Sequence, residues 1–229
     1  MTTNQKRQPV GIPVGGEFAS TEHAVNPKVT LPAAADQDLE TMGNNAAQAV
    51  YEAMGDVQAS DDGGGMYLLI DSSDGESLHS GCPTLASDNP DAKWYVESSD
   101  GNFYKEHPDF GHDAEPEAVA SWIREVSTRY EAGLSADRAA LRVGEIMEGA
   151  ESHNDGDGIY LTIPTSVPDE TIVSGCPVAA NDDPKATWYV ESAGGDFHED
   201  HPTFTHDTDT EAVASWIREA KGRFESAQS

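Results

Sequence analysis

The sequence predicts an α+β protein built as a tandem duplication of one small unit: a helix, a three-stranded antiparallel sheet and a second helix. The peptide EAVASWIRE occurs at Glu117–Glu125 and again at Glu211–Glu219. With an offset of 94 positions, 31 of the 52 residues from Ser80 to Glu131 match their partners. Self-similarity at a fixed period is typical of a repeated structural unit. We therefore expect a tail at 1–35, a first repeat at 36–132 and a second repeat at 133–229.

Each unit is predicted to begin and end with an amphipathic helix. In the first unit, apolar residues recur at three- and four-residue steps from Leu39 to Val57. Its counterpart in the second unit is predicted to begin after Ser135, a favourable N-cap residue. The closing helix contains the repeated peptide, and Pro116 fits its first turn. Asp113 or Glu115 suits the positive end of its dipole. One face of that helix carries Val119, Trp122, Ile123, Val126 and Tyr130.

Short apolar runs bounded by Gly and Asp predict the strands. Met66–Ile70 and Ile159–Ile163 have this character, and Trp94–Ser98 is predicted as a second strand. Asp100 and Gly101 signal a hairpin turn, after which Phe103 opens a third strand. Double-stranded-RNA-binding domains share this element order, but they need a basic face for phosphates, whereas this chain is acidic.

Charge is distributed unevenly along the chain. Of 42 acids and 13 bases, the tail holds two acids and three bases, so residues 36–229 carry 40 acids and 10 bases, a formal charge of −30. The tail contains Pro and Gly without apolar periodicity and is predicted to be disordered. It has no long apolar run, so we expect neither a signal peptide nor a membrane anchor, and we expect a cytoplasmic protein.

One segment of the tail has a recognisable pattern. RQPVGIPVGGEF, Arg7 to Phe18, resembles the Gln-Pro-x-Gly-x-Pro-x-Gly-Gly-x-Phe openings of actinobacterial and actinophage proteins. The resemblance is confined to these residues and implies no activity.

A cluster of metal-ligand residue types precedes the last helix of each unit. HPDFGHD spans His107–Asp113, and HPTFTHD spans His201–Asp207. With the two cysteines, they form a candidate zinc set for a hydrolase: Cys82, His107, His112, Cys176, His201 and His206. Their spacing matches no zinc motif, so we favour a structural turn in which Asp113 caps the helix and the histidines bond to backbone. We expect no cofactor, and one cysteine per unit indicates reduced thiols rather than a disulfide framework.

Catalytic signatures do not appear elsewhere in the sequence. It has no glycine-flanked serine elbow, no P-loop and no dinucleotide fingerprint, which favours a non-enzymatic protein. The four tryptophans lie in apolar strand or helix faces, which indicates core positions rather than ligand platforms.

The net charge favours imitation of a polyanion. B-DNA carries about one charge per ~1.7 Å of axis, so ~30 charges correspond to ~50 Å, or on the order of 15 base pairs. We therefore expect a DNA mimic from a phage or mobile element, an anti-restriction type of inhibitor that occupies the basic nucleic-acid-binding surface of a partner protein without binding nucleic acid or membrane itself. The expected partner-binding acids recur in both units: Asp88, Glu97, Glu125, Glu131, Asp182, Glu191, Glu219 and Glu225. The alternative is an acidic housekeeping module whose charge serves only solvation.

Overall fold

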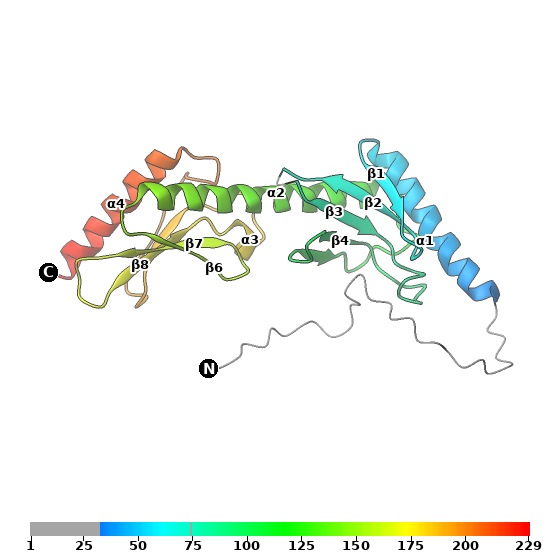
Figure 1. Cartoon of the computed structure of the whole chain (residues 1–229), viewed down its shortest axis with the longest axis horizontal. Coiled ribbons are helices and arrows are strands. Elements are labelled where there is room, and N and C mark those ends of the chain that lie inside the picture. Colours follow the sequence, from blue (N-terminus) through cyan, green and yellow to red (C-terminus); the bar gives the residue numbers. More distant parts are fainter. Residues whose placement is uncertain (1–32, 74) are drawn as a thin grey trace. The chain divides into compact units, whose positions relative to one another are not determined.

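The computed structural model describes residues 33–73 and 75–229, and it contains two halves with the same order of strands, to which the second half adds the short helix α3 (Figure 1). The first half comprises α1 (Ala33–Met54), β1 (Gln58–Asp61), β2 (Met66–Asp71), β3 (Ser77–Gly81), β4 (Tyr95–Ser98) and β5 (Tyr104–Glu106). The helix α2 (Pro116–Ile146) follows. The second half comprises β6 (Glu151–Asn154), β7 (Ile159–Pro164), β8 (Thr171–Gly175), α3 (Val178–Asn181), β9 (Tyr189–Ser192), β10 (His198–Asp200) and α4 (Thr210–Ala227). The tail predicted at 1–35 lies outside the described residues as far as residue 32, and α1 begins at Ala33.

Each half contains one antiparallel sheet in which every strand pairs with its neighbour in the sequence. The strand orders are β1-β2-β3-β4-β5 and β10-β9-β8-β7-β6. The α+β class is therefore confirmed, but the prediction of three strands per sheet is wrong, because each sheet has five. The missed first strand, Gln58–Asp61, is a polar and mostly exposed edge strand. The missed third strand, Ser77–Gly81, has Ser, His and Gly among its residues, which are poor strand signals.

Residues predicted to divide the two units form the middle of one helix. α2 runs unbroken for 31 residues, so the prediction that a new helix begins after Ser135 is wrong. No proline interrupts this stretch, and Gly133, with Ala179 of α3 beside it, takes a helical conformation. A single glycine costs a helix only about 1 kcal/mol, which neighbouring packing offsets. The predicted boundary between residues 132 and 133 falls inside α2, whose first part corresponds to α4 and whose last part corresponds to α1.

Helices cover one face of each sheet. In the first half, Leu68 and Val96 of the sheet and Ile123 of α2 are fully buried in one apolar cluster. Their counterparts in the second half are the equally buried residues Leu161, Val190 and Ile217. Full burial of one such side chain stabilises the fold by about 1.5–3 kcal/mol. Trp94 and Trp188 are buried in these clusters, whereas Trp122 and Trp216 are half-buried against the edges.

The other face of each sheet is formed by the alternate residues of the strands. In β4 the burial alternates, with Tyr95 and Glu97 partly exposed and Val96 and Ser98 buried. We call this surface the open face, because no helix among the described residues packs against it. Successive side chains along a strand point to opposite faces of the sheet, so every second side chain of each strand lies on the open face.

Candidate interaction surface

Two arginines at equivalent positions of the halves bind the ends of helices. Arg124 Nη2 of α2 donates to the carbonyl oxygens of Ala53 at 3.1 Å and Met54 at 3.2 Å, at the end of α1. Arg218 Nη2 of α4 donates to the Ile146 carbonyl oxygen at 3.2 Å, at the end of α2. Helix C-termini carry unpaired carbonyls and a partial negative charge, so cations stabilise them. These arginines therefore neutralise backbone dipoles and leave the carboxylates uncompensated.

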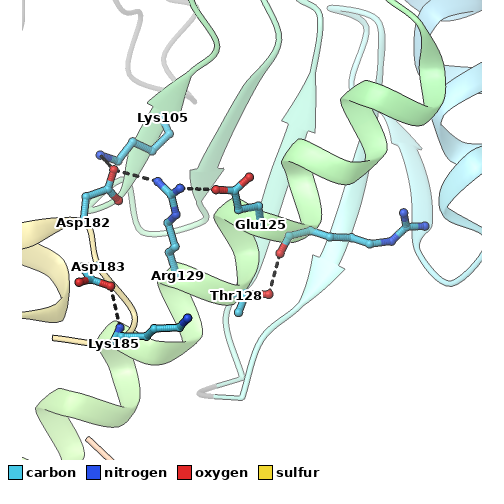
Figure 2. A network of polar contacts seen from close by, with 8 residues as sticks. Lys105, Glu125, Thr128, Arg129, Asp182, Asp183 and Lys185 are labelled. Atoms are coloured by element: carbon cyan, nitrogen blue, oxygen red, sulfur yellow. Dashed lines mark hydrogen bonds and ion pairs between the residues drawn. The ribbon is translucent and has the colours of Figure 1, made fainter. Parts of the chain in front are cut away.

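A second group of cations pairs with a few carboxylates. Asp182 Oδ2 accepts from Arg129 Nη1 at 3.1 Å and lies 3.3 Å from Lys105 Nζ, and Arg129 also pairs with Glu125 (Figure 2). These contacts join α2 and β5 to the segment after α3. In the second half, Arg223 forms a two-pronged pair with Glu199, at 3.1 and 2.6 Å.

Most positive side chains are consequently engaged within the molecule. Lys93 donates to the Asp109 carbonyl oxygen at 3.2 Å, Arg138 donates to Ser73 Oγ at 3.1 Å, and Lys221 lies 3.9 Å from Glu225. Together with the five cations above, at least eight of the ten bases in residues 36–229 have a partner among the described residues. At least twenty-seven of the forty acids there cannot have an arginine or lysine of their own, because the whole chain contains only thirteen.

The structure separates the predicted partner-binding acids into different environments. Asp88 and Asp182 occupy the same left-handed backbone conformation, with φ of 50° and 51°, but the contacts with Lys105 and Arg129 belong to Asp182. Glu125 and its counterpart Glu219 are both exposed; Glu125 is paired with Arg129, whereas the charge of Glu219 acts on Arg223, whose ion pair is with Glu199.

Glu131 and Glu225 have a structural role in both halves. Each lies on a helix and accepts the backbone N–H at the tip of a β-hairpin, from Ser73 at 2.8 Å and from Ser166 at 2.6 Å. The Ser166 hydrogen bond lowers the pKa of Glu225 below its usual range. These two acids hold loops in place, so they are poor candidates for partner contact.

Glu97 and Glu191 lie on the open faces. Glu97 pairs across the sheet with His79 and Tyr104, and partial burial raises its pKa, an effect that the nearby His79 opposes. Glu191 lies 3.4 Å from His198 Nδ1 on the neighbouring strand. These two carboxylates remain on a surface that a partner can reach.

The histidine clusters form turns. Nδ1 of His107 accepts the backbone N–H groups of Asp109 and Phe110 at 3.1 Å, and its ring stacks on Phe110 at 3.6 Å. His201 repeats this arrangement with Thr203 and Phe204.

The remaining members of the candidate zinc set are placed separately. His112 Nδ1 lies 3.0 Å from the Pro90 carbonyl oxygen, and His206 Nδ1 lies 3.1 Å from Asp207 Oδ1. Within the described residues, no three or more His, Cys, Asp or Glu side chains are grouped to hold a metal ion. The expected Asp113 cap is wrong, because the N-cap positions are Glu115 and, in the second half, Asp209, whose carboxylate accepts the Ala212 N–H at 3.1 Å.

The cysteines are equivalent, buried and free. Sγ of Cys82 donates to the Ala92 carbonyl oxygen and Sγ of Cys176 donates to that of Ala186, both at 3.2 Å. Burial raises the pKa of Cys82 to about 11 and that of Cys176 to about 12. Thiols held protonated in this way are weak nucleophiles and weak metal ligands.

Sequence reasoning missed a set of aromatic residues on the open faces. Tyr67 and Tyr95 flank Gly81 in the first half, and Tyr160 and Tyr189 flank Gly175 in the second. The tyrosines and glycines occupy equivalent positions in the two copies, and this recurrence is the sequence signal that could have identified them. Without β3 and β8, however, no sequence pattern places these tyrosines side by side.

Comparison with known proteins adds no further constraint. No protein-family model matches the sequence, and neither a curated protein nor a solved structure matches it. Among the helices of the described residues, none is both long enough and apolar enough to cross a membrane.

Proposed function

We propose that this chain is a non-enzymatic, acidic interaction protein that occupies the basic nucleic-acid-binding surface of a partner, such as a host-defence nuclease or another DNA-binding protein. The proposal rests on which groups the arginine and lysine side chains contact. Arginines and lysines are directed at helix ends, loops and a few carboxylates of the protein itself, which leaves an excess of solvent-facing carboxylates.

Such a charge distribution is unfavourable for an isolated fold. Uncompensated like charges repel one another and destabilise the compact state. A basic partner removes this repulsion by supplying the missing cations, and the complementary potentials accelerate encounter and select the partner. The duplicated unit enlarges the acidic surface by repeating it, as a polyanion repeats its phosphates.

The proposal is tested by competition with DNA. Immobilised protein is incubated with a cell lysate at low salt, and bound protein is challenged with a DNA duplex of on the order of 15 base pairs, the length that matches the charge. We expect the duplex to release the partner, and we expect binding to weaken steeply as salt rises, because many charge pairs form together. Polyglutamate of equal charge serves as the control for non-specific anion competition.

The alternative, acidity that serves only solvation, predicts the opposite results. No protein would then bind tightly at low salt, or the bound protein would resist displacement by the duplex. Release by polyglutamate as effective as release by DNA would also contradict mimicry, because it would show attraction to any polyanion.

A further inference from the structure

The open face of the first half contains two tyrosine rings flanked by carboxylates. Gly81 lies between Tyr67 and Tyr95, and a Cβ atom at position 81 would lie 3.4 Å from Tyr67 Cβ and 3.7 Å from Tyr95 Cε1. The glycine therefore leaves room for the Tyr95 ring to lean over β3. These three residues also line a cavity of about 80 Å³, together with Asp62 and with Asn44 of α1.

The second half repeats this arrangement. Gly175 lies between Tyr160 and Tyr189, with corresponding distances of 3.4 Å to Tyr160 Cβ and 3.4 Å to Tyr189 Cε1. Burial, together with Glu191, Asp155 and Tyr160, raises the pKa of Tyr189 to about 12. In the first half, burial, Glu97 and Asp62 act on Tyr95 in the same direction. Each tyrosine pair is thus accompanied by two equivalent carboxylates.

Other positions on the two open faces differ between the halves. His79 in β3 corresponds to Val173 in β8, and both pair with the central glutamate of the face. Tyr104, which stacks on Tyr95 at 6.0 Å, corresponds to His198, which stacks on Tyr189 at 6.1 Å. The tyrosine pair, the glycine and the two acids are therefore kept in both halves, while these neighbouring positions differ.

We propose that each open face binds an arginine side chain of the basic partner, between the carboxylates and over the tyrosine rings. The inference rests on the proposed function, because it specifies how the acidic protein recognises that partner. Charge complementarity identifies the occupant: two carboxylates beside partly exposed tyrosine rings attract a cation and repel phosphates. A guanidinium group is planar, stacks on aromatic faces and forms two-pronged hydrogen bonds with carboxylates, whereas an ammonium group is a compact, strongly hydrated charge.

The test compares arginine-only and lysine-only peptides of equal length, labelled with a dye and titrated with the full chain at low salt. Fluorescence anisotropy reports the affinities. We expect the arginine peptide to bind more tightly, with the tyrosine pair contributing roughly two- to fivefold per face. The double variant Tyr95→Leu with Tyr189→Leu should lose this preference while it still binds the lysine peptide. The double variant Tyr95→Phe with Tyr189→Phe keeps the rings and should keep the preference, which separates a direct contact from a loss of folding.

A second comparison uses two double variants, each of which removes two carboxylates. Glu97→Gln with Glu191→Gln should weaken arginine-peptide binding more than Glu117→Gln with Glu211→Gln, which removes two exposed carboxylates at helix starts. Equal losses, or equal affinities of the wild type for both peptides, would overturn the arginine site and leave the proposed function standing. Failure of both peptides to bind would contradict the proposed function itself.

Discussion

Replacing Asp182 by Asn tests whether the internal cations are matched to particular carboxylates. Asp182 Oδ2 lies 3.3 Å from Lys105 Nζ and 3.1 Å from Arg129 Nη1. Asparagine tolerates the left-handed conformation at this position, so the substitution removes the charge and keeps the backbone. Asp88→Asn is the matched control, because Asp88 has the same conformation, is exposed, and forms no ion pair with a lysine or arginine of the described residues.

The expected change in the free energy of unfolding follows from the solvent exposure of the three paired side chains. The Asp182 side chain is 42% exposed, that of Lys105 44% and that of Arg129 33%, so solvent screens both pairs. Pairs of this kind contribute about 0.2–1 kcal/mol each. We expect Asp182→Asn to lower the free energy of unfolding by about 0.5–1.5 kcal/mol at low salt, since it removes both pairs and leaves two cations without their shared anion. Asp88→Asn should change it by less than about 0.5 kcal/mol.

Urea denaturation followed by tryptophan fluorescence measures the difference. The difference in free energy of unfolding between the two variants should shrink when the ionic strength is raised from about 0.1 M to about 1 M, because the Debye length falls from ~10 Å to ~3 Å. The two variants should rank in the opposite order for partner binding. Asp88→Asn should weaken the affinity for the basic partner more than Asp182→Asn, because the Asp88 carboxylate is not already paired with an internal cation. A loss for Asp182→Asn no greater than that for Asp88→Asn, or one insensitive to salt, would refute the reasoning.

Three further predictions concern other sites. The Asp137 carboxyl group accepts the Ile159 N–H at 2.7 Å, and burial raises the pKa of this carboxyl group above its value in the unfolded chain. The contribution of Asp137 to the free energy of unfolding is therefore greatest below the unfolded pKa. It is lost as pH rises through the folded pKa. Asp137→Asn, which supplies the amide that Asn44 provides in the first half, should therefore be more stable than wild type in urea at about pH 7 and equal to it at about pH 3, while Asn44→Asp should show the opposite change. Glu219→Lys should weaken the partner complex more than Glu125→Lys in a salt-dependent binding assay, because Glu125 is already paired, and the double reversal should weaken it most. Elemental analysis should find no stoichiometric zinc, and His112→Ala should leave the circular dichroism spectrum unchanged; about one zinc per half would revive the hydrolase interpretation.

The sequence by itself determined the features that depend on local pattern. The repeat predicted two copies of one α+β unit, and both halves have the same order of strands. Apolar spacing identified the helical segments around Val50 and Ile123, because a helix presents one face at every third or fourth residue. The turn at Asp100 and Gly101 was equally readable, since Gly101 has φ of 72° and the strands on either side pair directly.

Only the tertiary structure decided how many strands each sheet has and that one helix, α2, runs through the predicted repeat boundary. β1 and β3 are held by pairing with β2, so their own residues did not need to be apolar or β-branched. Nothing in the chain around Gly133 forbids a helix, and contact with α3 supports its continuation.

The partners of the charged and aromatic side chains were likewise beyond the reach of the sequence. Arg124 meets carbonyls about seventy residues earlier in the chain, and Asp182 meets Lys105 across the repeat. Gly81 admits the Tyr95 ring because β3 and β4 pair in one register, in which these two residues are opposite. Contacts of this kind are set by strand register and helix packing, which bring distant residues together and which no local pattern encodes.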